Sequence, residues 1–147
     1  MRKLLSIGVM FLSASLLADV TARISGEDAA GNREVTLENE HLRAKFSTLG
    51  GRLTSLVNKA DGRDLVWSTK GGNSGSMKDQ FPPMSYEFRS GQYAARIVSS
   101  APEKAVVELK SASVEGRWKF QSVTRTISLS RGETALRCAL EIANHTE

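Results

Sequence analysis

The feature that most constrains the fold of this chain is a series of short runs in which apolar and polar residues alternate, with turn residues roughly every 8–12 positions. The clearest run is residues 42–47, where Leu42, Ala44 and Phe46 share one parity. We expect further strands at residues 34–38, 53–57, 63–67, 84–89, 93–100, 104–112, 117–130 and 134–143. No stretch after residue 22 shows a helical period, so the pattern predicts an all-β fold, an antiparallel β-sandwich or barrel.

Side-chain parity within these runs predicts which residues form the core. In residues 53–57, we expect Leu53 and Val57 on one face and Leu56 on the other. The parity of residues 117–130 changes midway, which indicates a β-bulge near residues 121–122. The last run places four apolar side chains on one face, so we expect Cys138 to be a small core residue; the four are Leu136, Cys138, Leu140 and Ile142.

The N-terminus has the form of a secretory signal peptide. Two positive charges precede about 15 mostly apolar residues, 4–18, a run too short to cross a membrane as a helix. Small residues follow, and Val20 and Ala22 fit a cleavage site after Ala22, while Ala18 is a poorer alternative. We expect a signal peptide at 1–22, a flexible segment at 23–33 and one sandwich domain at 34–147. A retained anchor helix is the alternative.

Composition and charge restrict the location and the partners. The single cysteine allows no intramolecular disulfide, which favours a bacterial periplasmic or secreted protein with no membrane contact after cleavage. The net charge of +4 comes from interspersed acidic and basic residues. A nucleic-acid-binding protein would cluster its Lys and Arg residues, so that class is excluded.

Motifs for catalysis and metal binding are missing from the sequence. His41 and His145 are far apart, and no zinc-ligand spacing exists. The glycine-rich residues 71–75 lack the Lys-Ser/Thr ending of a phosphate-binding loop. No nucleophile elbow is present, and no two carboxylates are singled out as a glycosidase pair. The sequence therefore predicts no catalytic residue, no cofactor and no metal.

Four residues are candidates for carbohydrate contact. Arg125 has the parity of Val123, Ile127 and Leu129, and a charge on an apolar strand face must be paired or must line a cleft. A salt bridge or an edge position is the structural alternative, and it is favoured. Aromatic faces can stack on sugar rings, although core packing is the favoured role for each of these: Trp67, Tyr86 and Trp118.

Residues 35–65, VTLENEHLRAKFSTLGGRLTSLVNKADGRDL, resemble the opening of the galactose mutarotase-like supersandwich domains. The match rests on an Asn after the first strand, a Gly-Gly turn and a closing "K--Gr-l" pattern. Residues 136–146 resemble the strand of that family that finishes in "N-t". The matching residues of the opening are Leu37, Asn39, Leu42, Phe46, Gly50, Gly51, Leu53, Leu56, Lys59, Gly62, Arg63 and Leu65.

The resemblance implies a supersandwich-like antiparallel fold that binds carbohydrate on a concave face. Its relatives include aldose epimerases, sandwich domains of polysaccharide lyases and α-mannosidases, and the periplasmic domain of the YidC-type insertase. The catalytic His and Glu of the epimerases follow the strand that ends here at Asn144, so none is carried over, and His145 does not match. We expect the N-terminal half of a larger domain, an incomplete sandwich with an open sheet edge.

Three hypotheses follow. The leading one is an exported carbohydrate-binding or accessory sandwich without catalytic residues. The second is a truncated enzyme of the epimerase or lyase type, and the third is a periplasmic interaction module resembling the insertase domain. The sequence leaves open whether the chain is an enzyme, which sugar it binds and what its oligomeric state is.

Overall fold

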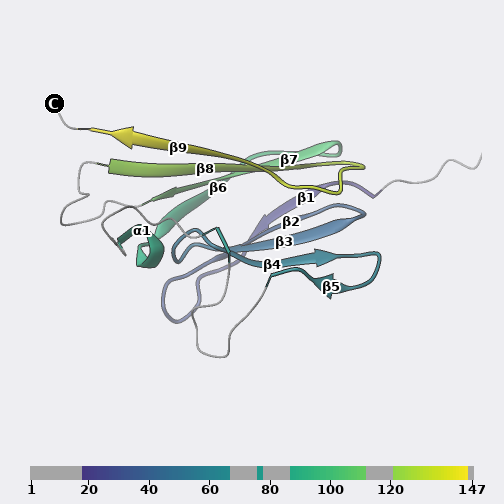
Figure 1. Ribbon diagram of the computed structural model, residues 1–147, viewed down its shortest axis with the longest axis horizontal. Helices are drawn as coiled ribbons and strands as arrows, with labels where there is room; N and C mark the ends of the chain where they lie inside the picture. Colours follow the sequence, from purple (N-terminus) through teal and green to yellow (C-terminus); the bar gives the residue numbers. More distant parts are fainter. Residues whose placement is uncertain (1–17, 67–75, 78–86, 112–120, 146–147) are drawn as a thin grey trace, which may run out of the picture.

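The computed structural model describes residues 18–66, 76–77, 87–111 and 121–145, and these form two antiparallel sheets (Figure 1). The strand order follows the sequence in both sheets, and one short helix, α1 (Glu87–Ser90), precedes the second sheet. The first sheet contains β1 (Thr21–Ile24), β2 (Glu34–Glu38), β3 (Leu42–Ser47), β4 (Leu53–Asn58) and β5 (Arg63–Asp64). The second contains β6 (Tyr93–Ala101), β7 (Lys104–Ser111), β8 (Gln121–Ser130) and β9 (Arg137–Asn144). The prediction of an all-β sandwich is confirmed.

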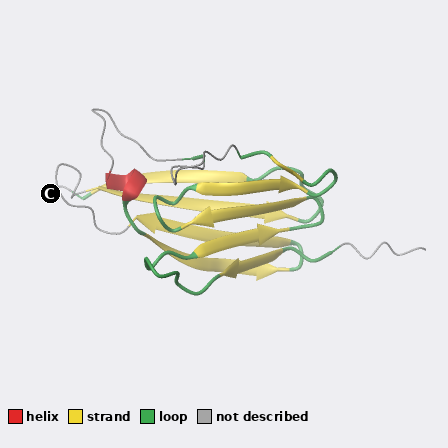
Figure 2. Ribbon diagram, turned by 90° about the horizontal axis from the view of Figure 1, so that it is seen from below, coloured by secondary structure: helices red, strands yellow, loops and turns green. Residues whose placement is uncertain are grey.

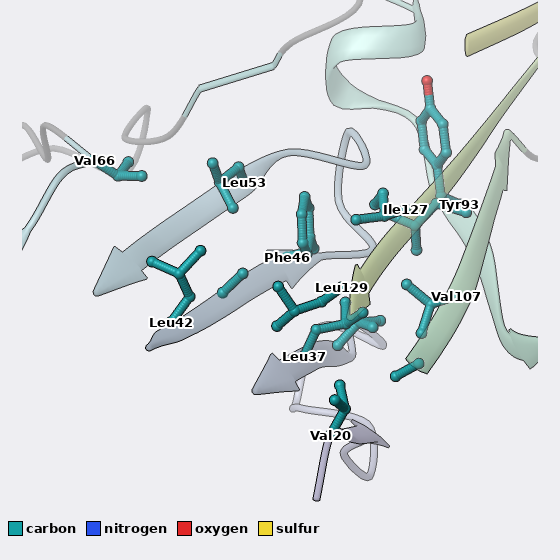
Figure 3. Close-up of a cluster of buried hydrophobic side chains, with 14 of the residues drawn as sticks. Val20, Leu37, Leu42, Phe46, Leu53, Val66, Tyr93, Val107, Ile127 and Leu129 are labelled. Carbon is teal, nitrogen blue, oxygen red and sulfur yellow. The ribbon is translucent and has the colours of Figure 1, made fainter. Parts of the chain in front are cut away.

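The core lies between the sheets, and alternation creates it. In β2 and β3, Val35 pairs with Phe46 and Leu37 with Ala44, and all four side chains are fully buried. The second sheet supplies the facing side chains of β7 and β8, where Ala105, Val107, Leu109, Val123, Ile127 and Leu129 are equally buried. Figure 3 shows members of both sheets meeting in this cluster. One face of each sheet is therefore apolar and the other is open to water.

A register shift changes the predicted parity of β4. Between Lys45 and Phe46 the pairing of β3 with β4 shifts, so that Phe46 pairs with Leu53 while Ala44 pairs with Leu56. Leu53 and Leu56 both contact the core as a result. The expectation that Leu53 shares a face with Val57 was wrong, because the shift inverts the alternation after Leu53. The bulge predicted near residues 121–122 concerned Trp118 and Phe120, which lie outside the described residues.

The last strand corrects the prediction for Cys138. In β9 the inward parity is as expected, since Cys138, Leu140 and Ile142 pair with Ile127, Arg125 and Val123 of β8. Cys138 is nevertheless exposed, and Leu140 and Ile142 are 52% and 49% exposed. The reason is position: β9 is the edge strand of its sheet, and the described part of the facing sheet does not cover it.

Two further elements differ from expectation. A strand was expected at residues 84–89, but residues 87–90 form α1, and residues 84–86 lie outside the described residues. Residues 23 and 24, expected in a flexible segment, form the second half of β1, which pairs with β2. The following residues make a turn in which Asp28 accepts backbone hydrogen bonds from Ala30 and Asn32. No helix among the described residues has the length and hydropathy needed to span a membrane.

One buried amide connects the ends of the two sheets. The Asn39 side chain is 1% exposed and lies in the β2–β3 turn. Its Oδ1 accepts the backbone N–H groups of His41 (2.9 Å) and Leu42 (2.8 Å). Its Nδ2 donates to the carbonyls of Ser130 and Glu133, both at 2.8 Å, in the β8–β9 connection. Because both amide atoms are fully engaged, this asparagine fixes the two hairpin ends against each other.

Candidate functional site

Arg125 occupies the position in β8 that its parity predicts, inside the sandwich. Its side chain is 2% exposed and is the largest among the fully buried side chains of the described chain. Nη1 of Arg125 donates to the carbonyl oxygen of Gly51 in the β3–β4 turn, 74 residues away. The guanidinium thus bridges the two sheets by a charge-assisted hydrogen bond. Arg125 is almost completely buried and has a structural partner in Gly51. Its contact with a ligand stays a prediction.

The turn that receives Arg125 is packed too tightly for any residue except glycine. Gly50 and Gly51 have φ angles of 69° and 54°, as the sequence predicted for a Gly-Gly turn. A Cβ on Gly50 would overlap the carbonyl of Arg89 in α1, and one on Gly51 would come within 3.0 Å of the Tyr93 ring. The Gly50 N–H donates to the carbonyl of Gly91 at 2.7 Å. The turn and the start of β6 therefore form one closed end of the sandwich.

The three aromatic candidates, Trp67, Tyr86 and Trp118, lie outside the described residues. The structure therefore does not place them relative to Arg125, and their role in carbohydrate contact stays a prediction.

An open pocket of about 520 Å³ lies elsewhere, at the first sheet. It is lined by residues of the β1–β2 connection together with Phe46, Ser47 and Thr54 of β3 and β4. Arg125 is not part of its lining. The connection and the first residue of β2 contribute mainly polar groups: Ser25, Gly26, Glu27, Asp28, Asn32, Arg33 and Glu34. Carboxylate, amide, hydroxyl and guanidinium groups thus surround one concave surface, and each of them can hydrogen-bond a hydroxyl-rich ligand.

Sequence reasoning missed this pocket because residues 23–33 were expected to be flexible. Asp28 organises the connection: Oδ1 accepts the N–H groups of Ala30 and Asn32, and Oδ2 accepts Nδ2 of Asn32 at 3.1 Å. An Asp followed by Gly31-Asn32 is a signal for such an Asx turn. The turn is anchored to the sheet because Arg33 N–H donates to Thr48 Oγ1 at 2.8 Å.

Charges in the pocket are fixed by local partners. The hydrogen bonds from Asn32 hold the pKa of Asp28 below its usual value, so this carboxylate is ionised at neutral pH. Arg33 Nη2 lies 2.7 Å from Glu27 Oε1, and both side chains remain about half exposed. An ion pair that is half exposed keeps free hydrogen-bonding positions toward the solvent, which a ligand can occupy.

Catalytic and metal-binding arrangements do not emerge from the described residues. No three His, Cys, Asp or Glu side chains in the described ranges are grouped to hold a metal ion. Ser122 Oγ and His145 Nε2 lie 2.9 Å apart, but the described chain provides no carboxylate partner that would orient this histidine. A nucleophile and base without an orienting third group are not a catalytic triad.

The fold and the pocket define a two-sheet antiparallel sandwich with an open edge strand and a polar concave surface, and such a fold alone does not define a function. Comparison with protein families assigns the chain more closely: the model of the glycosyl hydrolases family 38 C-terminal domain matches residues 37–147. The chain belongs to this family. No curated protein matches the chain. The expected kinship with sandwich domains of glycan-active proteins is thus confirmed at the level of this family, without a specific link to the mutarotases.

Proposed function

We propose that this chain is an exported accessory β-sandwich of a glycan-active protein and that it contacts carbohydrate without catalytic residues of its own. The observation that carries the proposal is membership of a glycosyl hydrolase C-terminal domain family over residues 37–147. The N-terminal signal sequence supports export to the periplasm or the exterior. The mutarotase-like motif of residues 35–65 is compatible with the same role, because those domains also handle sugars.

The pocket of the β1–β2 connection is the carbohydrate surface that the geometry supports best. Its volume of about 520 Å³ lies in the range of small-ligand sites, roughly 300–1,000 Å³. Asp28 and Glu27 accept hydrogen bonds from sugar hydroxyls, while Arg33 and Asn32 donate to them. Arg33 combines an exposed guanidinium with a position on the pocket wall, so it is the residue to change first.

The first experiment screens the mature chain against an array of neutral and acidic glycans and measures the affinity of any hit by calorimetry. Arg33→Ala is expected to weaken binding about tenfold, the effect of losing one hydrogen-bonded charged group. Arg96→Ala is the matched control, because Arg96 makes a similar ion pair with Glu108 at 2.8 Å on the other sheet. If both variants weaken glycan binding equally, the pocket is excluded as the binding site. A folded chain that binds no glycan would contradict the proposal.

The aromatic candidates provide a second, independent readout. Trp67 and Trp118 are the only two tryptophans of the chain, so intrinsic fluorescence reports on these two positions alone. If the two tryptophans stack on sugar rings, as their apolar faces allow, a bound glycan shifts the fluorescence emission. Trp67→Phe or Trp118→Phe then removes the part of this shift that comes from the substituted residue. An unchanged spectrum at saturating glycan would restrict the contact to the polar pocket.

A second candidate function, an interaction module, is favoured by one observation: the inward row of β9 is uncovered. Leu140 and Ile142 are half exposed on an edge strand whose outer backbone groups have no neighbouring strand within the described chain. Such an edge accepts an extended segment with alternating apolar side chains as an added strand. Slow hydrogen exchange of the β9 amides that point away from β8, measured in the isolated chain, would contradict this candidate, since amides on a free edge exchange fast.

A further inference from the structure

The start of the sandwich lies closer to the N-terminus than the signal-peptide pattern suggests. Val20 is 3% exposed and belongs to the hydrophobic core, and its N–H donates to the carbonyl of Pro102 at 3.1 Å. Asp19 Oδ1 lies 2.7 Å from Arg131 Nη2. β1 then pairs with β2 over four residues, from Thr21 to Ile24. Residues 19–24 are therefore an integral part of the fold.

β1 also closes one side of the sandwich. It contacts β6 and β7 of the opposite sheet in addition to its partner β2 (Figure 1). Figure 2 shows the same two-sheet arrangement from another side, and Figure 3 shows the Val20 side chain pointing into the core cluster. Ala22 and Ile24 pack against that cluster as well. The strand thus covers apolar side chains that would otherwise face water on this side.

The pattern of small residues favours cleavage after Ala22, with Val20 and Ala22 at the positions a signal peptidase reads. A chain cut there begins at Arg23 and lacks the buried Val20, the ion pair of Asp19 and two of the four β1 pairs. A cut after Ala18 removes none of these. Ala18 and Asp19 are both exposed and precede the strand, and Ala18 is a small residue of the type required at the cut.

We propose that the signal peptide is removed by hydrolysis of the Ala18–Asp19 peptide bond and that the mature protein begins at Asp19. Water adds across this bond, which leaves a carboxylate on Ala18 and an amino group on Asp19. The peptidase acts on the unfolded chain during export, so folding does not hide either bond. The form that accumulates is the form that folds, because a product that lacks part of its core is preferentially unfolded and degraded. This inference rests on the proposed export.

The test is to express the full precursor in a Gram-negative host and to determine the N-terminus of the periplasmic product by intact mass and N-terminal sequencing. The expected N-terminus is Asp19. Ala18→Val is expected to block processing, because a branched side chain does not fit the peptidase at the cut. The matched variant Ala22→Val is expected to leave the N-terminus at Asp19, and valine suits a strand position.

A product that begins at Arg23, an uncleaved precursor, or blocked processing in Ala22→Val would each overturn the proposal. Sequencing reads the N-terminus of any product that is recovered, whether or not that product is folded. A chain that starts at Arg23 should also melt at a temperature lower than the Asp19 form by roughly 5 °C or more. Glycan binding is measured in a separate experiment, so a chain that binds no glycan would not change the interpretation of the N-terminal sequence.

Discussion

β8 and β9 are neighbouring strands with the same alternation, yet their inward side chains lie in opposite environments. The inward side chains of β8, from Val123 to Leu129, are at most 2% exposed. Their direct partners Cys138, Leu140 and Ile142 in β9 are exposed. The two rows point to the same side of one sheet, so the difference comes from the facing sheet, whose described strands cover β8 and leave β9 open. Parity determines the face of the sheet on which a side chain lies, and the facing sheet determines whether that side chain is buried.

The largest expected effect compares two isoleucines of these rows. Ile127→Ala should lower the free energy of unfolding by about 2–5 kcal/mol, because it leaves a cavity among fully buried neighbours. Ile142→Ala should cost about 1 kcal/mol or less, because Ile142 is 49% exposed. Equilibrium unfolding in urea measures both values. Equal losses would show that β9 is covered in solution.

A smaller effect is expected at the amide that joins the β8–β9 connection to the first sheet. Asn39→Ala removes the partners of two backbone N–H groups and two carbonyls, and should cost about 2–4 kcal/mol. Asn39→Asp retains the acceptor for His41 and Leu42 but directs a carboxylate at the carbonyls of Ser130 and Glu133. It should therefore destabilise the fold at neutral pH and recover in part as the carboxyl is protonated in acid. A stability unaffected by pH in this variant, relative to wild type, would contradict the assignment of Nδ2.

The next prediction, of intermediate size, is that an ion pair of the first sheet makes stability depend more strongly on pH than an ion pair of the second sheet does. Hydrogen bonds from Arg43, and then from Lys59, lower the pKa of Glu38 from 4.5 to about 2. Because the folded pKa is depressed, the stabilisation is present above about pH 4.5 and is lost as the pH falls toward 2. With its side chain 28% exposed, solvent screening leaves roughly 1–2 kcal/mol.

Glu38→Gln should therefore lower stability at pH 7 and flatten the acid limb of the stability curve, measured as urea midpoints between pH 2 and 7. Glu108→Gln is the comparison on the second sheet. Its partner Arg96 has a side chain that is 67% exposed, and exposed pairs contribute about 0–1 kcal/mol. A steeper acid limb in Glu38→Gln than in wild type would contradict the lowered pKa.

The smallest perturbation reads the exposure of β9 directly. Cys138 is the only cysteine, so thiol labelling reports on one position of the uncovered row. We expect it to react in the native protein at a rate within about tenfold of the unfolded chain, without a loss of stability. Labelling that requires global unfolding would show that another layer covers this strand.

Local pattern was sufficient for β2 and β3, whose alternation is clean and whose predicted bounds agree with the structure. It failed for β1, because the small residues Val20 and Ala22 satisfy both a peptidase motif and a strand. It failed for the coverage of β9, because coverage depends on the width of the opposite sheet, which no local pattern encodes.

The candidate site shows the same division. The position of Arg125 on the inward face followed from parity, whereas its partner Gly51 is 74 residues away and lay beyond local reasoning. The pocket of the β1–β2 connection was missed, although the Asp28 turn that shapes it has a recognisable sequence. Residues 23–33 were expected to be a flexible N-terminal segment, and the fold instead anchors this connection to the sheet through the hydrogen bond of Arg33 to Thr48.

The buried amide of Asn39 has a consequence for how the protein forms. Its two carbonyl partners lie more than 90 residues downstream, in the β8–β9 connection, which is synthesised long after the β2–β3 hairpin. The β2–β3 hairpin can pair as it is synthesised, but the Asn39 side chain gains these two partners only once the β8–β9 connection is available. Contacts of such high sequence separation slow folding, and until they form the first sheet exposes apolar surface and unpaired strand edges.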